Sequence, residues 1–317
     1  MQTYLFSILL AFGISLLFCA LLIPILRRLK AGQNILSYVK EHKNKSGTPT
    51  MGGLAFISAA IVAWFAFSRE IDRVSLLTIV IGLSYLAVGL IDDFLKCRHK
   101  ENLGLRAWQK FAFQTLIALF SAAFCIRAGL TKVYIPFTKY SVEMGFWAFP
   151  LVVFVFLATV NAVNLTDGLD GLAAGTCTPF FVVIGVLIAL QKGNTNISTL
   201  SFCLAGALMA YLLFNTSPAS VFMGDTGSLS LGGFISCICC FTGNALYVAV
   251  VGLVFVFSVI SVVMQVIYYK VSKGKRIFLM APLHHHFQKK GHSESKISYA
   301  YAVITTLLGV AVLAFAF

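Results

Sequence analysis

The stretch N-A-V-N-L-T-D-G-L-D-G, Asn161 to Gly171, places two carboxamides and two carboxylates at the end of an apolar span. Such groups require water, a cation or a ligand, because hydrocarbon cannot solvate them. Gly168 and Gly171 are expected to break the helix, so that the backbone can turn close to whatever binds. The stretch therefore predicts a membrane helix that ends in a polar binding site.

The rest of the chain has the composition of a polytopic membrane protein. Its 317 residues are 59% hydrophobic and 11% charged, and the mean hydropathy is +0.90. A soluble protein has no core large enough to bury so much apolar surface. The longest polar interval, about residues 27–50, is too short to fold alone. We therefore expect a single integral membrane domain over residues 1–317.

The apolar runs predict an all-α protein with about ten transmembrane helices. The expected spans cover residues 2–26, 52–68, 75–91, 109–128, 146–163, 172–190, 199–214, 229–242, 246–269 and 298–316. The first span has no Lys or Arg before or within it and is followed by basic residues, the reverse of a cleavable secretory signal. We expect this span to be retained.

Basic residues predict the orientation. Most of the 24 lysines and arginines follow odd-numbered spans, which places those exits in the cytoplasm and both termini outside. The formal net charge of +13 suits anionic lipid and an anionic substrate, and no nucleic-acid-binding motif accompanies it. The eight cysteines lie mostly within spans and lack metal-ligand spacing, so we interpret them as buried apolar residues.

Five of the six aspartates lie at the exits of spans three, five and seven, which parity places on the cytoplasmic face. Asp92 and Asp93, in G-L-I-D-D-F-L-K, repel each other unless a cation or a substrate proton offsets them, which suits metal binding or general-base catalysis. An acidic helix end neutralised by Lys96 and Arg98 is the alternative. The stretch around Asn164, Asp167 and Asp170 carries more oxygen ligands than helix capping needs.

The third exit reads F-N-T-S-P-A-S-V-F-M-G-D-T-G-S, residues 214–228. Gly224 and Gly227 around Asp225 are typical of a turn that holds a metal-bridged phosphate at the start of a helix. A simple helix cap by Asp225 is the alternative. Phe222 could stack on a base or face lipid.

Two further loops add basic and hydroxyl groups to this face. M-A-P-L-H-H-H-F-Q-K-K-G contains three successive histidines, which cannot all point one way to form a zinc tripod, so we expect hydrogen bonds to phosphate or sugar, or else a pH-sensing loop. K-S-G-T-P-T-M-G-G offers Lys45 and Thr50 to an anion, or only punctuates the start of a helix. Together these loops predict a site for Mg²⁺ and a diphosphate.

The motifs T-P-T-M-G-G, G-L-I-D-D, N-A-V-N-L-T-D-G-L-D-G-L-A, F-N-x-x-P-A-x-V-F-M-G-D-T-G-S and A-P-L-H-H-H-F resemble those of the bacterial phospho-N-acetylmuramoyl-pentapeptide-transferase family, within the polyprenyl-phosphate N-acetylhexosamine-1-phosphate transferase superfamily. The resemblance covers about residues 25–310. It implies an enzyme of the bacterial inner membrane that transfers phospho-MurNAc-pentapeptide from UDP-MurNAc-pentapeptide to undecaprenyl phosphate. The products would be lipid I and UMP, and the cofactor would be Mg²⁺. The resemblance leaves open whether the protein forms a homodimer.

The resemblance also implies roles by motif position. Asp225 would bind Mg²⁺, while Asp92 and Asp93 would activate the lipid phosphate or support the metal, with His284 as a further catalytic residue. The nucleoside side would be lined by Lys100, Asn164, Asp167, Asp170, Asn215, Phe222 and Gly224. The substrate pocket would be completed by Lys45, Thr50, Lys110, Ser228, Gln265, His285 and His286.

Two departures and two alternatives accompany this hypothesis. Gln288 stands where the family usually has Glu, and residues 33–42 lack the Gly-Pro and Arg of relatives. A sister enzyme that uses UDP-GlcNAc is one alternative, and a cation-coupled transporter is the other. Transporters generally place their carboxylates near the bilayer midplane, whereas these lie at one edge. The transfer could proceed by direct attack or through an aspartyl-phosphate.

Overall fold

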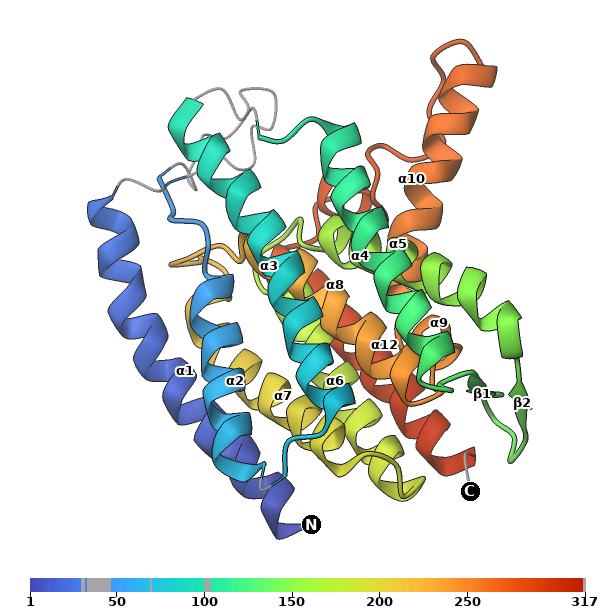
Figure 1. Ribbon diagram of the computed structural model, residues 1–317. Coiled ribbons are helices and arrows are strands. Elements are labelled where there is room, and N and C mark those ends of the chain that lie inside the picture. Colours follow the sequence, from blue (N-terminus) through green and yellow to red (C-terminus); the bar gives the residue numbers. More distant parts are fainter. Residues whose placement is uncertain (30–31, 33–46, 69, 100–103, 316–317) are drawn as a thin grey trace.

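The computed structural model describes residues 1–29, 32, 47–68, 70–99 and 104–315 (Figure 1). The described chain is mostly helical. Its helices are α1 (Gln2–Arg28), α2 (Gly53–Phe67), α3 (Arg73–His99), α4 (Ala107–Arg127), η2 (Gly145–Trp147), α5 (Ala148–Thr166), α6 (Leu172–Leu190), α7 (Thr195–Asn215), α8 (Gly224–Phe241), α9 (Tyr247–Val251), α10 (Leu253–Val271), α11 (Leu283–Lys289) and α12 (Glu294–Phe315). A short antiparallel hairpin, β1 (Lys132–Tyr134) with β2 (Ser141–Glu143), lies between α4 and α5.

An all-α polytopic membrane protein is confirmed. Within the described residues, eight segments are long and apolar enough to cross a membrane, and each of the ten expected spans coincides with helix. The difference lies in α2, which has only 15 residues, and in α8, whose first turns are rich in Gly, Ser and Thr. The number ten therefore stays a prediction.

The ninth expected span is wrong as a single helix. It is divided into α9 and α10 at Gly252, which has φ −90° and ψ 28°. A Cβ at this position would lie 2.5 Å from the carbonyl oxygen of Val248, so the change of direction requires glycine. Beyond the break, α10 leaves the bundle and projects from it (Figure 1).

α8 forms the centre of the bundle, and every residue from Thr226 to Phe241 is buried. It packs mainly against α3 and α5. The contact with α5 is close because a Cβ at Gly232 would lie only 2.6 Å from the Cα of Val160. Small residues at such contacts replace the hydrophobic driving force that lipid does not supply between helices.

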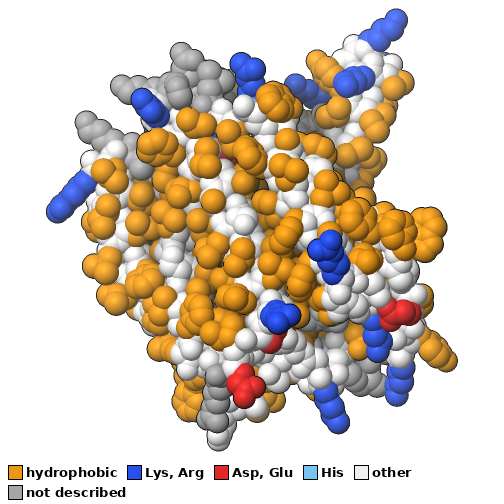
Figure 2. Space-filling view, viewed as in Figure 1, with side chains coloured by type: hydrophobic (Ala, Val, Ile, Leu, Met, Phe, Trp, Pro, Cys, Tyr) orange, Lys and Arg blue, Asp and Glu red, His pale blue; other side chains and the backbone are white. Residues whose placement is uncertain are grey.

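The two ends of the bundle differ in what they carry. The first residues of α1 and the last of α12 lie at one end, whereas α3 reaches Asp92 and Asp93 toward the opposite end (Figure 1). Hydrophobic side chains dominate the surface between them, and Lys and Arg gather mainly toward its edges and around the outer end of α10 (Figure 2). A polar site at one end of an apolar bundle suits chemistry at a membrane surface.

Candidate active site

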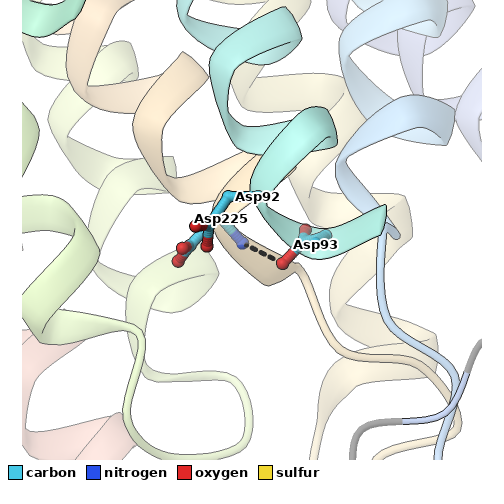
Figure 3. A group of neighbouring side chains, drawn as sticks. All are labelled: Asp92, Asp93 and Asp225. Carbon is cyan, nitrogen blue, oxygen red and sulfur yellow. Dashed lines mark hydrogen bonds between the residues drawn. The ribbon is translucent and has the colours of Figure 1, made fainter. Parts of the chain in front are cut away.

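Three carboxylates from two helices meet in one cluster. Asp92 and Asp93 lie near the end of α3, and Asp225 lies in the first turn of α8 (Figure 3). One oxygen from each carboxylate lies within 4.8 Å of the others. The sequence predicted each aspartate motif separately, and the packing of α3 on α8 brings them together.

Two glycines allow this approach. A Cβ at Gly89 would lie 2.1 Å from the carbonyl oxygen of Asp225, and Gly89 lies one turn before Asp92 and Asp93 on the same side of α3. Gly224 has φ +71°, and a Cβ there would lie 2.3 Å from Oδ2 of Asp93. Any larger residue at either position would push α3 away from the first turn of α8.

Asp93 caps α8. The backbone N–H of Asp225 donates to its Oδ1 at 3.1 Å, as Figure 3 shows, and the N–H and hydroxyl of Thr226 donate to its Oδ2 at 2.9 and 2.7 Å. A carboxylate at a helix N-terminus satisfies backbone donors and complements the helix dipole. Asp93 therefore fixes the position of Asp225.

Asp92 is arranged differently. Its Oδ1 accepts the backbone N–H of Leu105 at 2.7 Å, and its Oδ2 lies 2.6 Å from the ammonium group of Lys96. The same ammonium group lies 2.8 Å from Oδ2 of Asp225, so it bridges α3 and α8. Lys96 thus neutralises the acidic end of α3, as the alternative interpretation held, and it does so as a member of the site. The four-residue spacing from Asp92 to Lys96 is the signal that could have identified it.

Asp225 receives donors from two further helices. The ammonium group of Lys110, in the first turn of α4, lies 2.6 Å from its Oδ2. The side-chain amide of Asn164, in the last turn of α5, donates to its Oδ1 at 2.7 Å and to the hydroxyl of Ser228 at 2.9 Å. Asp225 is therefore the point at which α3, α4, α5 and α8 meet.

The donor set fits a hard divalent cation, because clustered carboxylate oxygens are the ligands that Mg²⁺ prefers. Asp93 is the least suited of the three because the first turn of α8 engages both of its oxygens. Asp92 and Asp225 instead face the ammonium groups of Lys96 and Lys110. These two residues would hold the cation.

The loop from Asp167 to Gly171 lies directly beside α11. α5 ends at Thr166 and α6 begins after Gly171, which has φ +72°, so the predicted break of the helix is confirmed. A Cβ at Gly168 would lie 2.4 Å from Nε2 of His284 and 3.0 Å from Nε2 of His285. Burial raises the pKa of the Asp167 carboxyl well above its usual value, and the charges of nearby aspartates raise it further.

His284 is fully buried, and neither ring nitrogen has a hydrogen-bond partner among the described residues. Its ring lies 4.4 Å from that of His285 and 6.4 Å from that of Tyr301, measured between centroids. Burial and, to a smaller extent, the neighbouring His285 together lower the pKa of His284 from 6.5 to about 3. The imidazole is therefore neutral and can exchange hydrogen bonds with a ligand.

This burial predicts a pH-dependent stability. Below pH 6.5 His284 binds a proton in the unfolded chain, whereas in the folded protein it stays unprotonated until the pH approaches 3. Protonation therefore favours the unfolded chain, and the free energy of unfolding decreases as the pH falls toward 3. We expect the melting temperature of the detergent-solubilised protein to fall between about pH 7 and 4, and His284→Gln to flatten that decline. The exposed His292→Gln is the matched control. An equally steep decline in His284→Gln would contradict the assignment.

Asp170 and Asn215 connect the loops that surround the site. Oδ2 of Asp170 accepts the N–H of Ala219 at 3.1 Å. Oδ1 of Asn215 accepts the N–H of Gly171 at 3.1 Å, and its amide donates to the carbonyl of Val221 at 2.9 Å. Both side chains are buried and form hydrogen bonds with backbone groups of these loops. Their contact with a nucleoside stays a prediction.

The loop before α2 runs alongside the loop before α8. The N–H of Phe222 donates to the carbonyl of Pro49 at 2.8 Å, and the N–H of Gly52 donates to the carbonyl of Phe222 at 2.9 Å. Thr50 is buried here, and its hydroxyl has no hydrogen-bond partner in the part of the chain that the structure describes. The predicted residues Lys45 and Lys100, and the divergent residues 33–42, lie outside the described residues.

The last predicted residues hold the segment that precedes α11. Gln265 on α10 accepts the N–H groups of Ile277 and Phe278 at 3.1 and 3.0 Å, and Nδ1 of His286 accepts the N–H of Leu279 at 3.1 Å. These hydrogen bonds connect Gln265 and His286 to the segment before α11 and not to the carboxylate cluster. The two side chains therefore fix the conformation of that segment.

Glu294 is a residue that the sequence reasoning missed. Gln288, which stands in place of the usual Glu, donates to its Oε1 at 3.2 Å, and the N–H of Asp170 donates to its Oε2 at 3.0 Å. Glu294 therefore links α11 to the loop from Asp167 to Gly171. A lone acid at the start of a helix gives no sequence signal for such a link.

Comparisons with known proteins show the family to which this chain belongs. Residues 74–243 match the model of glycosyl transferase family 4, and residues 45–57 match phospho-N-acetylmuramoyl-pentapeptide-transferase signature 1. The phospho-N-acetylmuramoyl-pentapeptide-transferase of Clostridium novyi (strain NT) is 40% identical over 312 residues, 97% of this chain and 95% of the relative. That of Bacillus subtilis (strain 168) is 42% identical over 314 residues, 98% and 96% of the two chains. The chain thus belongs to glycosyl transferase family 4, and within it to the phospho-N-acetylmuramoyl-pentapeptide-transferases.

Proposed function

We propose that this protein is a Mg²⁺-dependent transferase that moves phospho-MurNAc-pentapeptide from UDP-MurNAc-pentapeptide to undecaprenyl phosphate, giving lipid I and UMP for peptidoglycan synthesis. The observation that carries the proposal is the cluster of Asp92, Asp93 and Asp225 with the ammonium groups of Lys96 and Lys110. The names of the relatives, and the match to the signature at residues 45–57, support the muramoyl donor over UDP-GlcNAc.

The location of the cluster suits two substrates of opposite solubility. One is a lipid that diffuses in the membrane, and the other is a sugar nucleotide that arrives through water. The carboxylates come from the last turns of α3 and the first turn of α8, toward one end of an apolar bundle, where both substrates would approach. Catalysis at this edge explains why the polar motifs cluster where helices end.

We place the protein in the bacterial inner membrane as a single domain of about ten spans, with the site facing the cytoplasm and both termini outside. Two observations support this orientation. Most basic residues follow the odd-numbered spans, and the two ends of the chain lie at the end of the bundle away from the carboxylates. A homodimer is compatible with it.

The reaction joins two anions, so charge must be neutralised before attack. An oxygen of the lipid phosphate would attack the β-phosphorus of the donor, and the bond from that phosphorus to the oxygen bridging to UMP would break. Lys96 and Lys110 already lie within 2.8 Å of Asp225 and are placed to neutralise phosphate oxygens. Mg²⁺ held by Asp225 and Asp92 would neutralise the diphosphate further.

Asp92 is the residue we assign to the acceptor. One of its oxygens is fixed by the backbone N–H of Leu105, while the other lies beside the ammonium group of Lys96 and near the carboxylate of Asp225. That oxygen would orient the lipid phosphate or take its proton as the attack proceeds. The attack would be direct, without a covalent enzyme intermediate. Asp93 would contribute by fixing the position of Asp225 through its hydrogen bonds to the first turn of α8.

We assign the donor to the loops around Asp167 and His284. The nucleoside side would use Lys100, Asn164, Asp167, Asp170, Asn215, Phe222 and Gly224. The neutral imidazole of His284, which has no hydrogen-bond partner among the described residues, is suited to a sugar hydroxyl or a phosphate oxygen. Lys45, Thr50, Ser228, Gln265, His285 and His286 would complete the pocket.

The test is a transfer assay with radiolabelled UDP-MurNAc-pentapeptide, undecaprenyl phosphate and Mg²⁺. We expect labelled lipid and UMP only when both substrates and a divalent cation are present. UDP-GlcNAc in place of the donor is expected to give no lipid product. Absence of transfer by the folded protein would refute the proposal, and a phosphorylated Asp92 trapped with donor alone would refute direct attack.

A further inference from the structure

The start of α12 holds one residue of the loop between α5 and α6 by both of its backbone groups. The N–H of Asp170 donates to Oε2 of Glu294 at 3.0 Å, and the hydroxyl of Ser298 donates to the carbonyl of Asp170 at 2.8 Å. Glu294 and Ser298 are four residues apart, so they lie on the same face of α12. That face therefore fixes the position of the loop.

The carboxylate of Glu294 also reaches α11. Its Oε1 accepts a hydrogen bond from the side-chain amide of Gln288 at 3.2 Å, and Oε1 of Gln288 lies 3.1 Å from Nδ1 of His285. Glu294 is thus connected to the loop directly and to His285 through one intervening side chain. The mechanism above gives Glu294 no role.

The two groups that Glu294 holds lie against each other. A Cβ at Gly168 would lie 3.0 Å from Nε2 of His285, so this nitrogen is directed at the loop from Asp167 to Gly171. The loop and the imidazole are both assigned to the donor side of the site. Glu294 therefore sets the spacing between two parts of the same pocket, although it comes from a third segment of the chain.

The hydrogen bonds also determine where His285 carries a proton. An ionised carboxylate only accepts, so the Gln288 atom next to Glu294 is the amide nitrogen. The other end of Gln288, its oxygen, then faces His285 and can only accept, which makes Nδ1 the donor. A bond of this kind at one ring nitrogen decides which atom an imidazole presents at the other.

We propose that Glu294 is a positioning residue for the nucleotide donor. Through Gln288 it keeps a proton on Nδ1 of His285 and directs Nε2 at the donor pocket, and through the N–H of Asp170 it holds the opposing loop. The inference rests on the proposed function, which assigns the donor to this loop and these histidines. The acceptor lipid is assigned to Asp92, so Glu294 acts on the donor alone.

Exchanging the carboxylate and the carboxamide tests this direction of hydrogen bonding. In Glu294→Gln, the new amide keeps its oxygen toward the N–H of Asp170, so its nitrogen faces Gln288. Gln288 must then turn its oxygen to that nitrogen and its amide to His285, which removes the proton from Nδ1. In the double variant Gln288→Glu with Glu294→Gln, the new amide donates to the new carboxylate, which again accepts from Nδ1.

We expect Glu294→Gln to raise the KM for UDP-MurNAc-pentapeptide at least about tenfold, the effect of one misdirected hydrogen bond in the site. The KM for a polyprenyl monophosphate in mixed micelles should stay within about twofold of wild type. The double variant should recover the donor KM to within about threefold, because its two changes compensate each other.

Glu70→Gln is the matched control, because it removes an exposed acid before α3, at the end of the bundle opposite Asp92. It should leave both KM values unchanged. An unchanged donor KM in Glu294→Gln, an equal rise in both KM values, or a double variant no better than the single one would overturn the proposal.

A second measurement needs neither turnover nor a folded variant. Wild-type protein with isotope-labelled histidine is placed in lipid bilayers, and solid-state nuclear magnetic resonance reports whether Nδ1 of His285 bears a proton. We expect a proton on this atom in wild type and in the double variant, and none in Glu294→Gln. An unprotonated Nδ1 in wild type would overturn the proposal. A protonated Nδ1 in a wild-type protein that transfers nothing would instead refute the proposed function and leave the hydrogen-bond direction supported.

Discussion

Asp225→Asn is expected to lower the rate of UMP release by about a hundredfold to a thousandfold or more, the usual effect of removing one preorganised electrostatic group. The substitution keeps the shape of the side chain and removes the charge that Lys96, Lys110 and the cation share. Without that charge, the two ammonium groups repel each other and the proposed metal loses its main ligand. The measurement is initial rate against Mg²⁺ concentration with both substrates saturating.

The control for charge removal is Glu143→Gln, which changes an exposed acid on β2 in the same way. It should keep wild-type activity, because β2 precedes α5 and lies away from the carboxylate cluster. Melting temperature and elution volume establish that both variants are folded. A folded Asp225→Asn protein with near wild-type rates would remove Asp225 from the mechanism.

Gly89→Ala is expected to lower activity by about a hundredfold without touching either substrate, because misplacing a catalytic group by about 1 Å has effects of that size. The added Cβ would lie 2.1 Å from the carbonyl oxygen of Asp225, which cannot yield without moving the first turn of α8. We also expect a loss of about 1–3 kcal/mol in stability from overpacking. Activity and melting temperature measured on the same preparation test both effects.

Gly13→Ala is the matched control on α1, where an added Cβ meets no described atom within 4 Å. It makes the same change within a membrane helix and should leave both quantities near wild type or slightly raise stability. If Gly89→Ala retained full activity, the close contact of α3 with α8 would not be what positions Asp225.

The sequence was sufficient for the class of protein and for the position of most helices. Apolar runs of about twenty residues follow directly from the thickness of the bilayer, so α1, α3 to α7 and α12 could be predicted from hydropathy alone. The break at Gly252 could not, because a glycine within an apolar run is as compatible with a straight helix as with two. The structure shows the close approach that a side chain would obstruct there, between Gly252 and the carbonyl oxygen of Val248.

The aspartate motifs could also be recognised in the sequence, but the different roles of Asp92 and Asp93 could not. Asp92 and Asp93 are adjacent and chemically identical, and the sequence assigned them one shared role. The rotation of α3 against α8 decides that Asp93 caps the first turn of α8 while Asp92 pairs with Lys96. Such differences arise between helices far apart in the chain, so no local pattern records them.

The sequence by itself predicted that the polar loops at helix ends share one face of the membrane. This is possible because the hydropathy and charge of each residue can be taken directly from the sequence, and they indicate where each span ends and on which side its loop lies. Only the tertiary structure decided which side chains meet there: the Lys96 bridge, the closeness of Gly89 to Asp225, and the Asn164 amide that donates to Asp225. The physical reason is that contacts depend on the rotation and depth of each packed helix. Those quantities are fixed by the whole bundle at once.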